Sequence, residues 1–239
     1  MHEASHILAT DLDGTLVGDA DGLKQLLDFY AQQIYDVSLI YITGRHFSSA
    51  LSLIETENLP IPQILVTDVG TQIYTGEHFE EDKDWTARMQ QDWMPERIDQ
   101  IAAHIPGIVK QQLPVTNRCS FYVTDPSTVE DFGQQLEAAG IPHKLIFSGG
   151  KDVDILPKAS GKGQALTYLL DKYRIQDANL LIAGDSGNDL EMLSLGFPSV
   201  IVGNAQPELL ESPEHPFIFR ATKGFAGGIH EAWNHFHVK

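Results

Sequence analysis

Cysteine is nearly absent from this sequence: the 239 residues include one, Cys119, which cannot form an internal disulfide. Disulfides stabilise many secreted proteins, whereas a lone thiol is typical of a reducing compartment. Long hydrophobic runs are absent too, because no stretch reaches the roughly 18 apolar residues of a membrane-spanning helix. The N-terminal segment lacks the basic and apolar regions of a signal peptide. We therefore expect a cytoplasmic protein that does not enter a membrane.

Positive charge is also scarce. Lys and Arg number 16 against 33 Asp and Glu, which gives a formal net charge of −17. Such a charge repels the phosphates of nucleic acids and the surface of anionic membranes. We therefore expect neither as a partner, and we expect a monomer. An anionic substrate would need local positive charge from a bound metal ion or from a few well-placed lysines.

Internal repeats and low-complexity tracts are lacking as well, so the chain is expected to fold throughout. What the sequence does contain is an alternation of apolar strands and amphipathic helices near both ends. We predict strands over residues 6–13, 37–44, 179–185 and 198–204, and a strand and turn over residues 64–74. We predict helices over residues 22–33, 46–58, 161–173, 187–196 and 225–236. This order predicts an α/β fold, with a doubly wound parallel sheet and helices on both of its faces.

The pattern changes between these parts. We predict helices around Trp85 and Trp93 and over 126–140, and strands over 118–124, 143–148 and 152–157. Cys119, Phe121 and Val123 lie on one face of the 118–124 strand, which predicts that the thiol is buried. The sequence therefore predicts a catalytic core formed by residues 1–77 and 158–239, with a smaller α+β domain, residues 78–157, inserted into it.

Oxygen-bearing side chains follow two of the predicted strands. Asp11 and Asp13 end the first, and side chains two apart in an extended chain point to the same side. Asp185, Asn188 and Asp189 follow the strand over 179–185. Each segment alone is also typical of a turn or a helix cap. Together they supply an anionic site with oxygen ligands only, which suits Mg²⁺.

Groups suited to phosphate follow other elements. Thr43, Gly44 and Arg45 come directly after the second strand, where a hydroxyl, backbone N–H groups and a positive charge can hold phosphate oxygens, although the tripeptide also fits an ordinary turn. Lys162 begins a predicted helix, an electrostatically unfavourable position that a functional role would explain. Lys158 is the alternative, and sequence spacing alone does not separate the two.

The segments DLDGT, TGR, Lys162 and GDSGND occur in the order of the four motifs of the haloacid dehalogenase superfamily, which this sequence resembles. The insertion between the second and third motifs is similar to the cap of its sugar-phosphatase branch. More narrowly, YITGRHFSSALSLI, VTDVGTQIY, IFSGGKDVDILP and VGNAQPELL resemble the bacterial sucrose-phosphate phosphatases. Gly14 and Leu16 depart from that narrower family, whose first motif usually has Asn and an aromatic residue there.

The resemblance implies a Mg²⁺-dependent phosphatase acting through an aspartyl phosphate. Asp11 would attack phosphorus, and Asp13 would protonate the departing sugar oxygen and later deprotonate the hydrolytic water. Thr43 and Lys162 would bind the transferred phosphoryl group, aided by Gly44 and backbone N–H groups.

The resemblance also implies the metal ligands. Mg²⁺ would be held by the Asp11 side chain, the Asp13 backbone carbonyl and Asp185, while Asp189 and Asn188 would hold metal-bound water or Lys162.

Sucrose 6-phosphate is the substrate that the resemblance implies, and mannosylglycerate phosphate and glucosylglycerol phosphate are the alternatives. Arg45 is expected to contact the substrate. In the inserted domain, Lys151 and Asp152 follow two glycines and are candidates for binding sugar hydroxyls, although a solvated hairpin turn would look the same.

Two other functions remain open. A sugar phosphomutase would need a basic cluster for a second phosphate, yet the basic residues of the inserted domain are scattered. A non-enzymatic sensor would be expected to lack a catalytic carboxylate or the lysine, and the sequence retains them.

Overall fold

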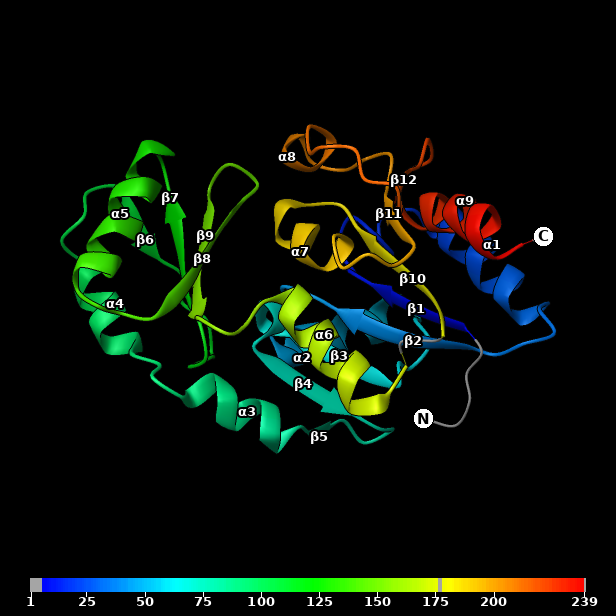
Figure 1. The fold of residues 1–239 in the computed structure, drawn as a ribbon, viewed down its shortest axis with the longest axis horizontal. Helices are drawn as coiled ribbons and strands as arrows, with labels where there is room; N and C mark the ends of the chain where they lie inside the picture. Colours follow the sequence, from blue (N-terminus) through cyan, green and yellow to red (C-terminus); the bar gives the residue numbers. More distant parts are fainter. Residues whose placement is uncertain (1–5, 176–177, 239) are drawn as a thin grey trace.

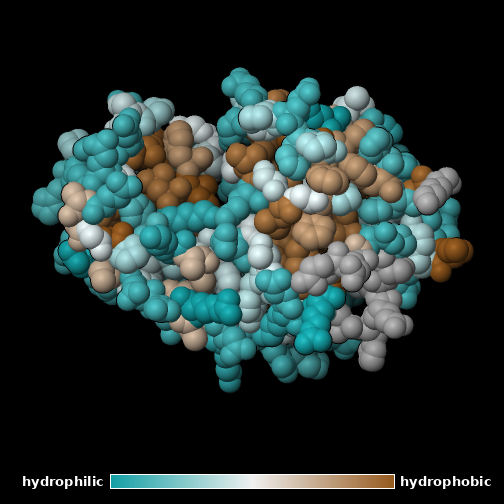
Figure 2. Space-filling view, viewed as in Figure 1, coloured by the Kyte–Doolittle hydropathy of each residue, from teal (hydrophilic) through white to brown (hydrophobic). Residues whose placement is uncertain are grey.

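The computed structural model describes residues 6–175 and 178–238, which form a larger and a smaller unit side by side (Figure 1). The predicted α/β fold with an inserted smaller unit is confirmed. The face seen in Figure 2 is mostly hydrophilic, with hydrophobic side chains of the smaller unit gathered beside the notch between the units. Over the described part of the chain, every helix is too short or too polar to cross a membrane.

Among the described residues, the larger unit is built on an eight-stranded sheet with the order β12-β11-β10-β1-β2-β3-β4-β5. Its strands are β1 (His6–Thr10), β2 (Val37–Ile42), β3 (Ile64–Thr67), β4 (Gln72–Thr75), β5 (Glu80–Glu81), β10 (Asn179–Gly184), β11 (Ser199–Ile201) and β12 (Ile218–Arg220). The pairs from β12 through β3 are parallel, as predicted. β4 and β5 instead run antiparallel, because a tight turn at Asp68–Gly70 reverses the chain directly after β3.

Helices cover both faces of this sheet, as the sequence predicts. One face packs against α1 (Ala20–Ala31), α2 (Phe47–Thr56) and α9 (Phe225–His237). The other packs against α3 (Lys83–Gln90), α6 (Lys162–Tyr173), α7 (Leu190–Leu193) and α8 (Pro207–Leu210). Successive side chains of β1 enter opposite cores, since Ile7 and Ala9 lie in the α6 core and Leu8 lies in the α1 core.

The helix predicted over 187–196 is shorter than expected. A 3-10 turn, Gly187–Asp189, precedes the four residues of α7, Leu190–Leu193. The helix ends at Leu193, with Ser194 as its C-cap, and Gly196, two residues later, has a φ of 86°. The short helix leaves the polar residues before it in a loop at the edge of the sheet.

The smaller unit contains an antiparallel sheet with the order β6-β7-β9-β8. Its elements are α4 (Pro95–Ala102), β6 (Ile108–Lys110), β7 (Cys119–Val123), α5 (Ser127–Ala138), β8 (His143–Ser148) and β9 (Asp152–Pro157). The expected burial of Cys119, Phe121 and Val123 is confirmed, because all three lie in one core with residues of α4 and α5. In the described ranges, the opposite face of the sheet is thus left without a helix of this unit.

The larger unit continues past residue 77. β5 pairs with β4, and Trp85 and Met89 of α3 pack in the core beneath α6. The indole Nε1 of Trp85 also donates to the carbonyl of Gly70 at 3.2 Å. These contacts favour a boundary after α3, and the division at residues 77 and 157 stays a prediction.

Candidate active site

Three polar segments meet at the carboxyl edge of the large sheet. β10, β1 and β2 are adjacent and parallel, and the chain leaves them at Asp185, Asp11 and Thr43. The N–H of Asp11 donates to the carbonyl of Ala183 at 3.0 Å, and that of Thr43 donates to the carbonyl of Val66 at 2.9 Å. The sheet therefore brings together motifs that lie far apart in the sequence.

Lys162 lies between two of the carboxylates. Its Nζ donates to Asp11 Oδ1 at 2.6 Å and to Asp189 Oδ1 at 2.7 Å. The Lys162 and Asp189 side chains are 1% and 0% exposed. Lys158, the alternative from the sequence, is exposed. The start of α6 therefore directs Lys162, and not Lys158, into the cluster.

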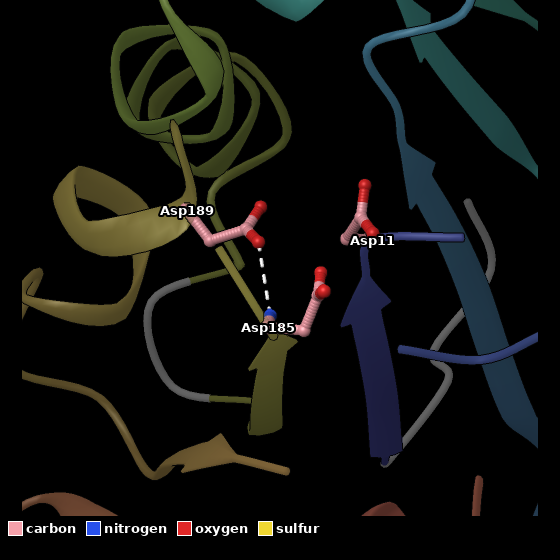
Figure 3. Close-up of side chains that lie close together, drawn as sticks. All are labelled: Asp11, Asp185 and Asp189. Atoms are coloured by element: carbon pink, nitrogen blue, oxygen red, sulfur yellow. Dashed lines mark hydrogen bonds between the residues drawn. The ribbon is translucent and has the colours of Figure 1, made fainter. Parts of the chain in front are cut away.

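The carboxylates of Asp11 and Asp185 face each other from the ends of β1 and β10, with Asp189 beside them (Figure 3). One oxygen from each of the three lies within 4.8 Å of the others. Asp189 Oδ2 also accepts from the backbone N–H groups of Asp185 and Ser186, both at 3.0 Å. Both Asp189 oxygens are therefore used within the protein.

Burial shifts the ionisation of this cluster. It raises the pKa of Asp11 to about 8 despite the opposing charge of Lys162, with repulsion from Asp189 and Asp185 adding to the shift. Burial, followed by repulsion from Asp189, raises the pKa of Asp185 to about 6. Burial opposes the positive form of Lys162, but Asp11 and Asp189 outweigh it and hold the pKa of Lys162 above its ordinary value. The cluster thus brings three carboxyl groups together with one ammonium group.

The donor set fits Mg²⁺. This ion prefers oxygen ligands and is commonly bound through one or two carboxylates. Asp11 and Asp185 supply such oxygens, and a divalent cation would favour the ionised forms that burial disfavours.

Asp13 is paired with Arg45. The Arg45 Nε and Nη2 atoms donate to the two oxygens of Asp13 at 2.6 and 2.7 Å. The Asp13 side chain is 50% exposed, and its carboxylate lies outside the acidic triad. Arg45 is tied to Thr43, whose buried hydroxyl accepts from the Arg45 backbone N–H at 3.1 Å, and Gly44 lies between them. The TGR segment and Asp13 are thus neighbours.

The turn after Asp11 contains groups that the sequence reasoning did not assign. Gly14 has a φ of 81°, and a Cβ there would lie 2.4 Å from Asp185 Oδ2. The Thr15 hydroxyl donates to Asp185 Oδ1 at 3.1 Å, and Asn204 Nδ2 donates to the Gly14 carbonyl at 2.8 Å. Thr15 and Asn204 belong to the segments DLDGT and VGNAQPELL. A sequence, however, does not show which oxygen lies beside a given hydroxyl or amide.

Lys151 and Asp152 lie at the β8–β9 turn of the smaller unit. The Lys151 side chain is exposed, and Asp152 Oδ1 accepts from Gln111 Nε2 at 3.1 Å. Asn188 lies elsewhere, in the loop after β10, where its Oδ1 accepts from the Ser186 hydroxyl at 3.3 Å. The structure thus places these three predicted substrate contacts in two separate segments.

The β8–β9 turn reaches the larger unit through Glu208 of α8. Glu208 Oε1 accepts from the backbone N–H groups of Gly149 and Gly187, each at 3.4 Å. A second polar contact, between Lys144 of β8 and Glu191 of α7, also joins the units. These contacts bring the turn that carries Lys151 beside the loop that carries Asn188.

The chain is similar to sugar-phosphate enzymes over nearly its whole length. Residues 4–237 match the family of sucrose-6F-phosphate phosphohydrolases. The chain is 36% identical to the probable sucrose-phosphatase 3a of Arabidopsis thaliana over 97% of its own length, but it spans only 60% of that relative. It is 32% identical to the mannosylfructose-phosphate phosphatase of Agrobacterium fabrum, with 96% of each chain covered. Among solved structures, a sucrose-phosphatase from Synechocystis in complex with sucrose and phosphate gives a TM-score of 0.91 at 34% identity, with 98% of each chain covered.

Proposed function

Because the chain belongs to the sucrose-6F-phosphate phosphohydrolase family, we propose that it is a phosphoric monoester hydrolase that converts sucrose 6-phosphate to sucrose and phosphate. One observation carries the proposal: Lys162 contacts both Asp11 and Asp189 in a buried acidic cluster at the carboxyl edge of the sheet. Such a cluster offers a nucleophile and a fixed positive charge in the same place.

Asp11 is the proposed nucleophile. Its carboxylate attacks phosphorus, the bond from phosphorus to the sugar oxygen breaks, and the phosphoryl group remains on Asp11 until water releases it. Lys162 opposes the effect of burial on the ionisation of Asp11 and fixes the orientation of the carboxylate. Asp189 holds Lys162 in turn, since its other oxygen is anchored by two backbone N–H groups.

Asp13 is the proposed acid and base. It gives a proton to the departing sugar oxygen and later takes one from the water that attacks the aspartyl phosphate. Asp13 forms a double hydrogen bond with Arg45, which occupies both of its carboxylate oxygens. Contact between Asp13 and the departing sugar oxygen therefore requires Arg45 to move away, which makes the guanidinium available to the substrate.

Mg²⁺ is the proposed cofactor, held by the Asp11 and Asp185 carboxylates and the Asp13 backbone carbonyl. When bound, it supplies charge that offsets the repulsion between a carboxylate and a phosphate dianion. Asp185 is held for this task by the Thr15 hydroxyl. Asp189, grouped with the candidate metal residues, was expected to hold metal-bound water or Lys162, and its two occupied oxygens favour the role of holding Lys162.

Thr43, Gly44 and Lys162 are proposed to hold the oxygens of the transferred phosphoryl group. The Thr43 hydroxyl and the Lys162 ammonium are both almost fully buried, so their interactions with an anion would be little weakened by water. Asn188 is proposed to contact the same group from the loop after β10. Donors fixed before the reaction stabilise the charge that develops in the transition state.

The smaller unit is proposed to be a cap that recognises the sugar. Lys151 and Asp152 lie on the turn that Glu208 brings beside the Asn188 loop, so a charged donor and an acceptor are presented at this junction. The units are joined by polar contacts such as Lys144 with Glu191. Such contacts can break and re-form as a substrate enters and leaves.

A phosphomutase fits the smaller unit less well, because it would need a cluster of free positive charges for a second phosphate. Lys110 pairs with Asp99, Lys144 with Glu191, and Arg118 with two carboxylates.

Mannosylfructose phosphate is the second candidate substrate, since the Agrobacterium relative matches this chain over 96% of both lengths. The cytoplasmic location and the monomeric state remain predictions from the sequence.

The test is phosphate release in the presence of Mg²⁺ across a panel of phosphate esters. The panel comprises sucrose 6-phosphate, mannosylfructose phosphate, glucosylglycerol phosphate, mannosylglycerate phosphate and glucose 6-phosphate. We expect the highest kcat/KM for sucrose 6-phosphate and no turnover by a folded Asp11→Asn control. A different preferred ester would replace the substrate and keep the chemistry, whereas absence of release from every ester would reject the phosphatase.

A further inference from the structure

Arg118 of the smaller unit is buried against an acidic residue of the larger unit. It stands directly before β7, and its Nε lies 3.2 Å from Asp68 Oδ1. Its Nη1 donates to Asp154 Oδ1 of β9 at 3.4 Å. The Arg118 and Asp68 side chains are 7% and 0% exposed. The Nε–H group is not directed at the Asp68 oxygen, so this contact is an ion pair without a hydrogen bond.

Asp68 begins a strained segment, Asp68–Gly70. The φ angles of Asp68, Val69 and Gly70 are 53°, 56° and 92°, all in the left-handed region. Glycine adopts this region freely, but a β-branched valine there is a genuine outlier whose backbone is strained. Contacts from the surrounding structure must therefore hold the segment in this form.

The strained segment lies between two groups proposed to bind the phosphoryl oxygens. On one side, its first two N–H groups donate to the carbonyls of Arg45, at 2.8 Å, and Thr43, at 3.2 Å. On the other side, a Cβ at Gly70 would lie 2.3 Å from the carbonyl carbon of Gly161 and 2.7 Å from the backbone nitrogen of Lys162. A shift of the segment would therefore displace the Thr43–Arg45 loop, the first turn of α6, or both.

We propose that Arg118 is a positioning residue: by pairing with Asp68, it holds the Asp68–Gly70 segment in its strained form and thereby fixes the Thr43–Arg45 loop and the start of α6. Arg118 comes from the smaller unit, so its docking couples the placement of that unit to the geometry of the phosphoryl-binding groups. This inference rests on the proposed function for its catalytic meaning, but the mechanical link between Arg118 and the loop stands on the contacts alone.

The link is tested by amide hydrogen exchange on the whole protein without substrate. In Arg118→Met, we expect the amides of residues 68 and 69 and the peptide covering residues 43–46 to exchange at least about tenfold faster than in the wild type. Lys110→Met is the matched control, because it removes the same charge from the same sheet while its partner, Asp99, lies within the smaller unit. In this control, amide exchange at residues 68 and 69 and over residues 43–46 should stay at the wild-type rate.

Two further variants separate positioning from general loss of stability. Arg118→Lys keeps the charge but cannot reach two carboxylates with a planar fork. The exchange rates of its residues 43–46, 68 and 69 should therefore lie between those of the wild type and those of Arg118→Met. Asp68→Asn removes the other half of the pair and leaves Arg118 bonded to Asp154. Asp68→Asn should speed amide exchange over residues 43–46, 68 and 69, and it provides this measurement even if Arg118→Met does not fold. The double variant should exchange at nearly the same rate as either single variant.

The functional consequence is measured with inorganic phosphate as the probe, by calorimetry with Mg²⁺ present. Arg118→Met should weaken phosphate binding by about five- to tenfold, the size of a typical coupling between sites, and Lys110→Met should not. Unchanged exchange over residues 43–46 in folded Arg118→Met or Asp68→Asn protein overturns the inference. Failure of the wild type to release phosphate from any ester would instead reject the proposed function, and the exchange result would remain valid.

Discussion

Lys162 Nζ donates to Asp11 Oδ1 at 2.6 Å, although the two residues are 151 positions apart in the sequence. The two side chains are 1% and 6% exposed, so water does little to stabilise either charge. Asp189 provides a second negative partner for the same ammonium. Lys162 is therefore the positive partner that two buried carboxylates share.

Replacement of Lys162 by methionine should destabilise the protein by about 3 kcal/mol, because it leaves buried carboxylates without their cation. Denaturant unfolding in the presence of a chelator measures the change. Lys158→Met is the matched control, and its free energy of unfolding should stay within about 0.5 kcal/mol of the wild type since Lys158 is exposed. Equal losses in the two variants would show that the Lys162 contacts contribute nothing specific.

Mg²⁺ should raise the melting temperature of the protein, since an ion that binds only the folded state stabilises it, by about 2.7 kcal/mol at a concentration of 100 Kd. Asp185→Asn should remove most of this effect, because Asp185 is one of the two proposed carboxylate ligands. Thermal unfolding with and without Mg²⁺ measures it. Asp84→Asn is the control, since Asp84 is exposed on α3, and it should keep the full shift. An undiminished shift in Asp185→Asn would place the metal elsewhere.

Gly14→Ala should weaken Mg²⁺ binding and lower kcat, by roughly tenfold or more, which corresponds to about 1.4 kcal/mol. The new Cβ would lie 2.4 Å from Asp185 Oδ2, and φ at this position is 81°, so either the carboxylate or the turn must shift. Metal titration of the melting temperature, together with phosphate release, measures both effects. Gly76→Ala offers a control, because its φ of 74° imposes the same backbone strain but its Cβ would meet no atom within 4 Å.

The parallel core and the meeting of the motifs were predictable because both follow from local patterns. Apolar strands alternate with amphipathic helices, and parallel strands place their carboxyl ends at one edge. Asp11, Thr43 and Asp185 each follow such a strand, so their convergence needs no knowledge of side-chain packing. The sequence also left Lys158 and Lys162 as alternatives, and only the direction of the first turn of α6 separates them.

The parts that were not predicted depend on contacts between distant segments. No local pattern shows that Trp85 packs in the core beneath α6, or that β5 extends the large sheet. The pairing of Arg118 with Asp68 is likewise invisible, because a basic residue before a strand is usually solvated. Strain at Val69 is also unexpected, since valine favours extended backbone and the surrounding contacts override this preference.

Lowering the pH from 7 to 4.5 should destabilise the protein through His237. Burial, with a smaller contribution from His6, lowers the pKa of His237 from its ordinary 6.5 to about 4. In the unfolded chain, His237 therefore binds a proton below about pH 6.5, whereas in the folded protein it binds one only below about pH 4. The free energy of unfolding decreases as the pH falls through this window. Because the ring is partly exposed, we expect a loss of about 1 kcal/mol.

The measurement is the difference between the wild type and His237→Gln in the free energy of unfolding, followed as a function of pH. The other titrating groups are common to both proteins, so the difference isolates His237. Relative to the variant, the wild type should lose stability as the pH falls below about 6.5 and should show no further relative loss below about 4. Parallel curves for the two proteins would contradict the assignment.

Lys151→Ala should raise KM for the preferred sugar phosphate by about tenfold, because it removes a donor that can bind a sugar hydroxyl from the β8–β9 turn. KM for a small aryl phosphate, which has no sugar to contact, should stay unchanged, and so should kcat for both substrates. The comparison of the two esters separates sugar recognition from any general disturbance of the cluster around Asp11. Lys110→Ala is the matched control, since Lys110 lies in the same sheet and pairs with Asp99. Equal rises of KM for the two esters would assign Lys151 to the phosphate and not to the sugar.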